Sequence, residues 1–265
     1  MTLLTIILPN YDYLDGYRKN LHQITNQKYV KPNNVRILIS DDSSSSLIED
    51  HFKENYILNE NMCFIHGPRS GAVSNWNQCI ESSETSYSMI LHHDEYIMSD
   101  KFLKCLLNIL TNDDADVIIL PLIKKSKGKY YKHYPVFLKW LYVYFPSLLF
   151  ACNAFGSPSV VVYRTNINEK YDEKLKWFVD VDWYYRLLSR GLKVRLISNK
   201  HLTIISDLDF DNTESKKMGP EKLSPVEKLY LKRKYGLPKI IYSRAMKPLQ
   251  FPVKIYKLFG LKDIK

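Results

Sequence analysis

The first 120 residues alternate short apolar runs with stretches whose apolar residues recur every three or four positions. The short runs predict strands at Leu3–Leu8, Val35–Ser40, Met62–His66, Tyr87–Leu91 and Asp116–Leu120. The stretches between them predict helices at Leu14–Ile24, Leu47–Asn55, Ala72–Glu81 and Lys101–Leu110. Repeated strand–helix units pack as a largely parallel sheet covered by helices, so the chain is predicted to belong to the α/β class.

The segment Val136–Phe155 is twenty residues long and mostly apolar, which makes it a candidate membrane span. A continuous span would bury Lys139 and lose its hydrogen-bond ladder near Pro146. We therefore expect a helix–turn–helix that covers the domain or dips into the membrane interface. The elements predicted after it are a strand at Ser159–Tyr163, a helix at Val181–Arg190 ended by Gly191, and a strand at Lys193–Ile197.

Composition limits the remaining classes. With 265 residues, 45% of them hydrophobic and 25% charged, the chain is that of a folded protein rather than a disordered or collagenous one. Its four cysteines are far apart and form no CxxC, so neither a disulfide framework nor a zinc ribbon is predicted. The N-terminus has no basic segment before its short apolar run, and we expect a cytoplasmic chain.

The positive charge is concentrated at the C-terminus. Residues 231–265 hold ten Lys and Arg against the single acid Asp263, which is +9 of the net +10. The other 230 residues carry 28 basic against 27 acidic side chains, which argues against a nucleic-acid binder. Apolar and aromatic residues interleave with the tail's charges, a mixture typical of segments that lie on anionic membranes. A solvated helix packed on the domain and an RNA-binding segment are the alternatives.

Acidic residues follow two of the predicted strands. Asp41 and Asp42 come after the second strand, and the run from His92 to Glu95 comes after the fourth. Because ligands of open α/β sheets bind outside the carboxyl ends of the strands, these residues could hold a nucleotide and a divalent cation. The alternative for both is a turn or helix-entry loop. No GxGxxG, GxxxxGK[ST] or HExxH is present, which excludes dinucleotide, P-loop and zinc-hydrolase sites of those types.

A further acid, Asp180, stands at the start of the predicted helix after Trp177 and Phe178. Asp182 on that helix can pair with Arg186 at i,i+4 and is interpreted as structural. Asp180 could be the N-cap, or it could act as a general base if an apolar wall limits water around it. The side chains that could form such a wall are Trp177, Phe178 and Trp183.

Six segments in this order form a recognisable set. They are Thr5–Tyr11, Leu38–Ser44, Gly71 with Asn75–Ile80, Leu91–Glu95, Gly156–Ser159 and Val179–Leu187. In sequence and spacing the set resembles the inverting, GT-A-fold glycosyltransferases of family 2, with Leu91–Glu95 as a variant of the family's DxD loop. The resemblance implies a Rossmann-like, mostly parallel central sheet flanked by helices, with a helical basic C-terminal tail. The implied domains are a GT-A domain over residues 1–205, with a nucleotide-binding half (1–120) and an acceptor and catalytic half (121–205), and a basic extension over residues 206–265.

The resemblance also implies roles for individual residues. Those expected to bind the nucleotide are Pro9, Tyr11, Asp41, Asp42 and Asp94. Asp94 and Glu95 would hold Mg²⁺ or Mn²⁺, with His92 as a further candidate ligand, and Asp180 would be the catalytic base. Two positions depart from the family pattern: His92 replaces the first Asp of DxD, and Val179 replaces a Glu before the base.

The function implied is metal-dependent, inverting transfer of a sugar from a nucleotide-diphosphate donor, first of all a UDP-sugar, to a hydroxyl of a polyprenyl-linked or other glycan acceptor. The expected setting is the inner face of the cell membrane in bacterial surface polysaccharide synthesis: lipopolysaccharide, O-antigen or capsule. One alternative is a catalytically silent binding partner. A nucleotidyltransferase is another, although Leu8–Gly16 lacks the lysine or arginine that a triphosphate loop needs.

Overall fold

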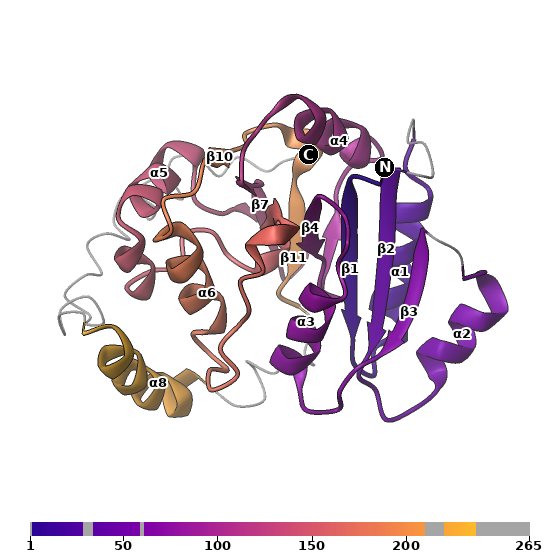
Figure 1. Ribbon diagram of the computed structural model, residues 1–265, viewed down its shortest axis with the longest axis horizontal. Helices are drawn as coiled ribbons and strands as arrows, with labels where there is room; N and C mark the ends of the chain where they lie inside the picture. The colour runs from indigo at the N-terminus through magenta and orange to yellow at the C-terminus, as the bar shows by residue number, and fades with distance from the viewer. Residues whose placement is uncertain (1, 29–33, 59–60, 210–219, 237–265) are drawn as a thin grey trace.

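The computed structural model describes residues 2–28, 34–58, 61–209 and 220–236, which form a central sheet flanked by helices and a smaller second sheet (Figure 1). The strands of the central sheet are β1 (Leu4–Asn10), β2 (Val35–Asp41), β3 (Met62–His66), β4 (Tyr87–Ile90), β6 (Val117–Ile119), β9 (Val161–Arg164) and β10 (Val194–Leu196). The α-helices are α1 (Leu14–Thr25), α2 (Leu47–Asn55), α3 (Ala72–Glu81), α4 (Phe102–Asn112), α5 (Val136–Tyr144), α6 (Val179–Leu188) and α8 (Pro220–Tyr235).

The central sheet is seven-stranded in the order β10-β6-β9-β4-β1-β2-β3. The strands β1, β2 and β3 are parallel, and β4 joins the other side of β1 in the same direction. Only β9 runs against its neighbours in this sheet, between β4 and β6. The prediction of an α/β chain with a mostly parallel central sheet is therefore confirmed, and each predicted element of this sheet and its helices lies within two residues of its observed bounds.

The strands are apolar because both faces of the sheet are covered. All seven residues of β1 are buried, including the consecutive Ile6, Ile7 and Leu8. Consecutive side chains on a strand point to opposite faces, so burial of all of them requires helices on both sides. This two-sided core fixes the strand ends, and with them the positions of the loops that follow β1, β2 and β4.

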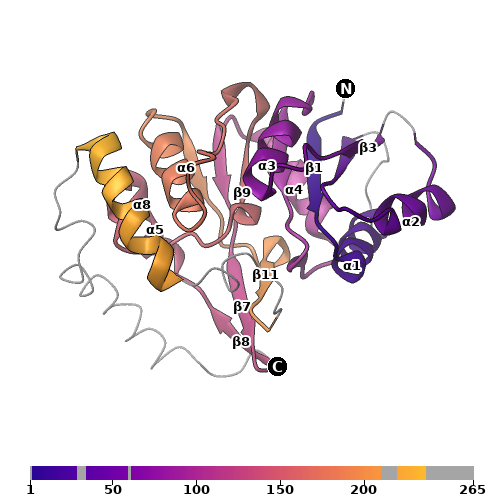
Figure 2. The same cartoon turned by 90° about the horizontal axis from the view of Figure 1, so that it is seen from below.

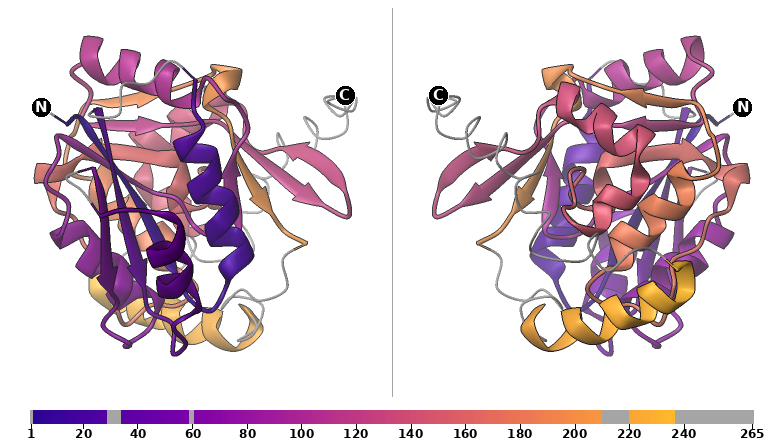
Figure 3. Two further views of the ribbon diagram at one scale, coloured as in Figure 1. Left: turned by 90° about the vertical axis from the view of Figure 1, so that its right-hand side faces the viewer. Right: turned by 90° about the vertical axis from the view of Figure 1, so that its left-hand side faces the viewer.

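The second sheet was not predicted. Its four strands, in the order β5-β11-β7-β8, are β5 (Glu95–Ile97), β11 (Ile204–Asp207), β7 (Leu122–Ser126) and β8 (Lys129–Lys132). These strands have three to five residues each, and β8 reads KYYK without an apolar run, so no periodicity reveals them. The β7–β8 hairpin projects from the body of the molecule (Figure 3). Strand β11 covers residue 205, where the boundary between the GT-A domain and the extension was predicted.

The apolar segment Val136–Phe155 folds as a helix and a turn of 3₁₀-helix. Helix α5 ends at Tyr144, and the 3₁₀-helix η2 (Pro146–Phe150) begins at the proline. Lys139 is buried, and its Nζ donates a hydrogen bond to the carbonyl of Leu120 at 3.2 Å. Among the described residues, no helix has the length and apolar character needed to cross a membrane.

The last described element, α8, packs beside α6 on the same side of the molecule as α5 (Figures 1 and 2). Within the predicted basic extension, residues 220–235 are thus a helix docked on the domain. The predicted basic tail beyond residue 236 lies outside the described residues.

Candidate functional site

The candidate site lies at the carboxyl ends of β1, β2 and β4. Strand β1 has parallel neighbours on both sides. The chain passes from β1 to β2 on one side, and the connection after β3 crosses to β4 on the other side. In open α/β sheets such a switch point opens the crevice in which ligands bind. The loops after β1 and β2 contact each other, because the Asp12 N–H donates to Ser43 Oγ at 2.7 Å. Helix α1 contacts the loop after β4, because Asn20 Nδ2 donates to the His92 carbonyl at 2.9 Å. The predicted nucleotide residues are therefore gathered at one edge.

Asp41 and Asp42 are buried and held by the protein. Asp41 Oδ1 accepts hydrogen bonds from the Ser43 N–H at 3.1 Å and Oγ at 2.5 Å. Asp42 Oδ1 accepts from the Arg69 N–H at 2.5 Å. Burial raises the pKa of both carboxyls, although these hydrogen bonds oppose the rise. The Asp41–Ser43 contact is the turn expected as the alternative, and with the Asp42–Arg69 contact it holds both carboxylates in place after β2.

The two other predicted nucleoside residues differ in their exposure. Pro9 is buried within β1, where it pairs with Ser40 of β2. Tyr11 is 48% exposed just after the strand. Of these two, Tyr11 is therefore the side chain that a ligand can reach directly.

His92 has a packing role. Its ring stacks on Trp76 of α3 with the ring centroids 4.7 Å apart, and the backbone N–H of His92 donates to Ser159 Oγ at 3.0 Å. Burial lowers the pKa of His92 to about 3, so the ring is neutral near pH 7. Its Nε2 is enclosed and has no hydrogen-bond partner among the described residues.

Glu95 connects the loop after β4 to the segment before β9, which holds Ser157. It is buried, and its Oε1 accepts a hydrogen bond from Ser157 Oγ at 2.5 Å. The Ser157 carbonyl in turn accepts from the Tyr184 hydroxyl of α6 at 2.6 Å. Burial, with a smaller contribution from the charge of Asp94, raises the pKa of Glu95 to about 8. Glu95 is therefore a neutral acid near pH 7 that braces these loops.

Asp180 lies in the first turn of α6. The helix begins at Val179, and the flanking residue Phe178 makes no side-chain cap, so Asp180 is not the N-cap. Burial raises the pKa of Asp180 to about 7, and the charge of Asp94 adds to the rise. Since this effect falls off with distance, the two carboxylates share one electrostatic environment at the site. A carboxylate with a pKa near the working pH is suited to general-base catalysis.

The apolar wall beside Asp180 differs in part from the prediction. Phe178 and Trp183 are buried, whereas Trp177 is 37% exposed. Trp183 stacks on Tyr171 at 5.0 Å between ring centroids. Burial raises the pKa of Tyr171 and Tyr184, and the negative charge of Asp180 adds to the rise for both hydroxyls. Tyr184, which is on the same helix as Asp180, and Tyr171, which the sequence reasoning did not single out, thus help to form the surroundings of Asp180.

The side chains offer limited support for a divalent cation. In the ranges that the structure describes, no three His, Cys, Asp or Glu side chains gather closely enough to hold a metal. Mg²⁺ usually needs only one or two carboxylates when substrate phosphates supply further oxygens. Asp94 can be such a carboxylate, whereas Glu95 is buried and accepts a hydrogen bond from Ser157. The donor set therefore fits a cation shared between Asp94 and a diphosphate.

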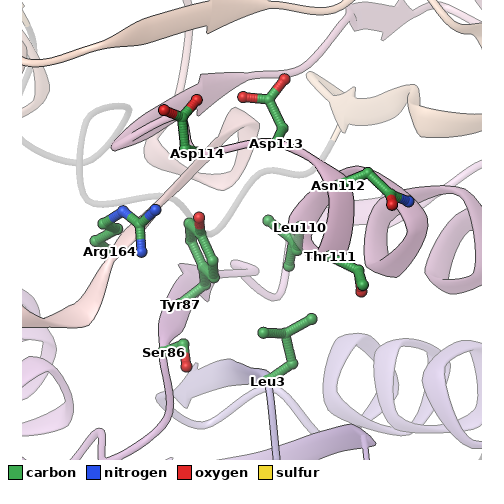
Figure 4. A pocket seen from close by; sticks show the side chains of 9 residues that line it. All are labelled: Leu3, Ser86, Tyr87, Leu110, Thr111, Asn112, Asp113, Asp114 and Arg164. Carbon is green, nitrogen blue, oxygen red and sulfur yellow. The ribbon is translucent and has the colours of Figure 1, made fainter.

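A shallow pocket of about 400 Å³ lies at the opposite edge of the sheet (Figure 4). It is lined by Leu3, just before β1, and by Tyr87, the first residue of β4. Arg164 borders it, with its guanidinium 5.0 Å from the Tyr87 ring centroid. These are the amino ends of the parallel strands, so the pocket is separate from the carboxylate site.

Sequence reasoning gave Ser157 no role in the site, although the segment Gly156–Ser159 was noticed as a motif. It also gave no role to Trp76, which lies in the noticed segment Asn75–Ile80 and supports His92. Both act through partners distant in sequence, 62 residues away for Ser157 and Glu95. Such pairs have no local pattern.

Comparison with known proteins agrees with this geometry. The chain resembles two structures of Staphylococcus aureus TarS residues 1–349, each at 15% identity. The UDP complex has a TM-score of 0.61 over 86% of this chain and 64% of that one, and the UDP-GlcNAc complex has a TM-score of 0.67 over 100% and 76%. This chain thus spans less than two thirds of the UDP complex, and the likeness confirms the predicted GT-A fold. No curated protein matches the chain. The family model described as Glycosyl transferase family 2 matches residues 5–172, and the chain therefore belongs to that family of glycosyltransferases.

Proposed function

We propose that this glycosyltransferase moves a sugar from a UDP-sugar to a hydroxyl of a glycan acceptor, with inversion at the anomeric carbon. The observation that carries the proposal is Asp180, a partly exposed residue at the start of α6 whose carboxyl pKa is raised to about 7 by burial and by the charge of Asp94. The UDP and UDP-GlcNAc in the similar TarS structures support UDP as the nucleotide.

The donor would lie over the ends of β1, β2 and β4. Asp41 and Asp42 would accept hydrogen bonds from the nucleoside, and Tyr11 would cover it from the solvent side. Pro9 would shape the floor from within β1. Asp94 would face the diphosphate.

Mg²⁺ or Mn²⁺ is the cofactor that suits Asp94. Bound there with the diphosphate, the cation would neutralise charge that develops on the leaving group. Glu95 was expected to be a second metal ligand. We propose instead that it supports the loop that carries Asp94, through its hydrogen bond with Ser157. His92 would act through its stacking on Trp76.

Asp180 would then be the base in a single displacement. Its carboxylate takes the proton of the acceptor hydroxyl while the acceptor oxygen forms a bond to the anomeric carbon. The bond from that carbon to the diphosphate oxygen breaks, and UDP leaves. Because attack and departure occur on opposite faces of the sugar, the configuration inverts.

Exposed surfaces support a membrane-presented acceptor and a location at the membrane. Helix α5 exposes Phe137, Trp140 and Tyr144, which are spaced i, i+3 and i+7 and share one side of the helix. Together with the basic residues 237–265, they suit a peripheral site on the inner face of a membrane, where a polyprenyl-linked glycan is presented. Lipopolysaccharide, O-antigen and capsule synthesis are the pathways that use such acceptors.

Titration calorimetry with UDP, GDP and dTDP, with and without Mn²⁺, tests the donor site. We expect UDP to bind and Mn²⁺ to tighten its binding. Asp94→Asn should lose the effect of the metal, whereas the matched variant Asp114→Asn, at the opposite edge of the sheet, should keep it. If the folded protein binds none of the three diphosphates, the proposal is wrong and a catalytically silent binding partner is favoured.

A further inference from the structure

We infer that Glu227 of α8 is a positioning residue for Asp180. It anchors the turn that leads into α6, so that the C-terminal helix holds the catalytic helix in place. The role of Asp180 rests on the proposed function, whereas the anchoring itself rests on contacts of the described residues. The family match ends at residue 172, so both helices lie beyond it.

Glu227 is only 5% exposed, which is unusual for a carboxylate on a surface helix. Its Oε1 accepts hydrogen bonds from the N–H groups of Lys176 at 2.9 Å and Trp177 at 3.1 Å. Its Oε2 accepts from Trp177 at 3.1 Å and Phe178 at 2.8 Å. One side chain therefore fixes three consecutive N–H groups immediately before α6 begins at Val179.

These contacts hold the turn that leads into α6, a helix without a local side-chain cap. The first N–H groups of a helix lack partners within the helix, and a Ser, Thr, Asp or Asn just before it usually supplies one. Here Phe178 stands at that position, and no side chain of the local sequence caps α6. The Glu227 carboxylate instead accepts from the preceding turn, and its negative charge is favourable near the positive end of the α6 dipole.

This arrangement leaves Asp180 available. In the described part of the chain its carboxylate accepts no hydrogen bond from the protein, although it lies in the first turn of a helix. Because Glu227 supplies the negative charge beside the preceding turn, Asp180 can face the site and an incoming hydroxyl.

Helix α8 holds α6 at a second place. Asp182 is fully buried and accepts hydrogen bonds from Lys234 Nζ at 2.9 Å and the Tyr235 hydroxyl at 2.6 Å. The Tyr235 ring also packs on Tyr185 of α6, with centroids 4.7 Å apart. With contacts from Glu227 in the middle of α8 and from Lys234 and Tyr235 at its C-terminal end, the two helices are held as one unit (Figure 2).

The test compares full-length Glu227→Ala and Glu227→Gln with Arg233→Gln, a control on the exposed side of α8. The readouts are UDP release from UDP-GlcNAc with water as acceptor, UDP affinity, and amide hydrogen exchange of residues 174–188. We expect Glu227→Ala to lower kcat by about tenfold to a hundredfold, since small misplacements of a catalytic group have effects of that order, with KM and UDP affinity unchanged. Exchange at residues 176–180 should accelerate.

Glu227→Gln keeps an acceptor oxygen, so it should recover part of kcat, while Arg233→Gln should match the wild type. Unchanged kcat and unchanged exchange in Glu227→Ala would overturn the inference. A fall in melting temperature with wild-type kcat would also overturn it, because it would show a role in stability alone. If the wild-type protein neither binds UDP nor releases it from UDP-GlcNAc, the proposed function fails, and amide exchange still decides whether Glu227 anchors α6.

Discussion

At the scale of single residues, carboxyl groups of the same site differ in their exposure and in their hydrogen bonds. Asp180 and Glu95 are both influenced by Asp94, yet Asp180 is partly exposed, whereas Glu95 is buried and bonded to Ser157. Burial raises both pKa values above those of exposed carboxyls, which lie near 4. Carboxyl environments that differ in this way can divide base and support roles between identical groups.

The raised pKa of Asp180 predicts a pH dependence of turnover. A base must be deprotonated to act, so kcat for UDP release should fall as the pH drops below about 7, by nearly tenfold per pH unit. An Asp with an ordinary pKa near 3.9 would leave the profile flat between pH 5 and 8. Initial rates across that range, with substrate above KM, provide the measurement.

Asp180→Asn is the control for this profile. It should lower kcat by ~10²–10⁴-fold, remove the pH dependence between pH 5 and 8 and leave UDP affinity intact. A flat wild-type profile, or near-wild-type turnover in Asp180→Asn, would contradict the assignment of the base.

At the scale of elements, the loop before β9 shows how packing constrains the site. Gly156 precedes Ser157, the partner of Glu95, and has a φ of +98°. A Cβ at this position would also fall on the Leu122 side chain of β7. Gly191, three residues after α6 ends at Leu188, has a φ of +70° but faces open space. The two glycines share a backbone requirement and differ in their neighbours.

Alanine substitution should therefore affect them unequally. Gly191→Ala carries only the left-handed backbone cost and should lower the free energy of unfolding by about 1 kcal/mol. Gly156→Ala adds a clash with Leu122 and should be clearly more destabilising, because the packed side chain must move. Urea denaturation of both variants measures the difference. Equal losses of stability would show that the loop yields to the added methyl group.

At the scale of the whole molecule, two features suit a membrane surface. The exposed aromatic side of α5 holds Phe137 and Tyr144, which are 69% and 72% exposed. The sequence from residue 237 onward carries seven basic residues and one acid. Aromatic side chains insert at the lipid interface, and basic residues contribute about 1 kcal/mol each near anionic lipid.

Vesicle sedimentation should separate these contributions. The full-length chain should bind vesicles containing anionic lipid, and binding should weaken as salt rises. A chain ending at residue 236 should lose most of the salt-dependent binding, whereas Phe137→Ser with Tyr144→Ser should weaken the salt-resistant part. Both should bind UDP as the full-length protein does. Failure of the full-length chain to bind anionic vesicles would exclude this location.

The local sequence determined the central fold because its signals are local. The apolar run of β3 and the periodic patterns of α2 and α3 predicted those elements with their observed bounds. Asp41 and Asp94 could be placed at one edge in advance, because parallel strands bring their carboxyl ends together. The pairing of Asp182 with Arg186, at 2.8 Å, was also predictable, because residues four apart on a helix are neighbours.

Only the tertiary structure decided the pKa values of these residues and the contacts that hold them in place. The strands of the second sheet are too short to show periodicity, and they form where partners such as β5 and β11 meet across more than a hundred residues. The pKa of Asp180 depends on burial and on Asp94, and its helix is anchored by Glu227, 49 residues beyond Phe178. Desolvation and hydrogen bonding act between groups that the fold brings together. The sequence therefore determined which carboxylates reach the site, and the packing around them determined what each can do.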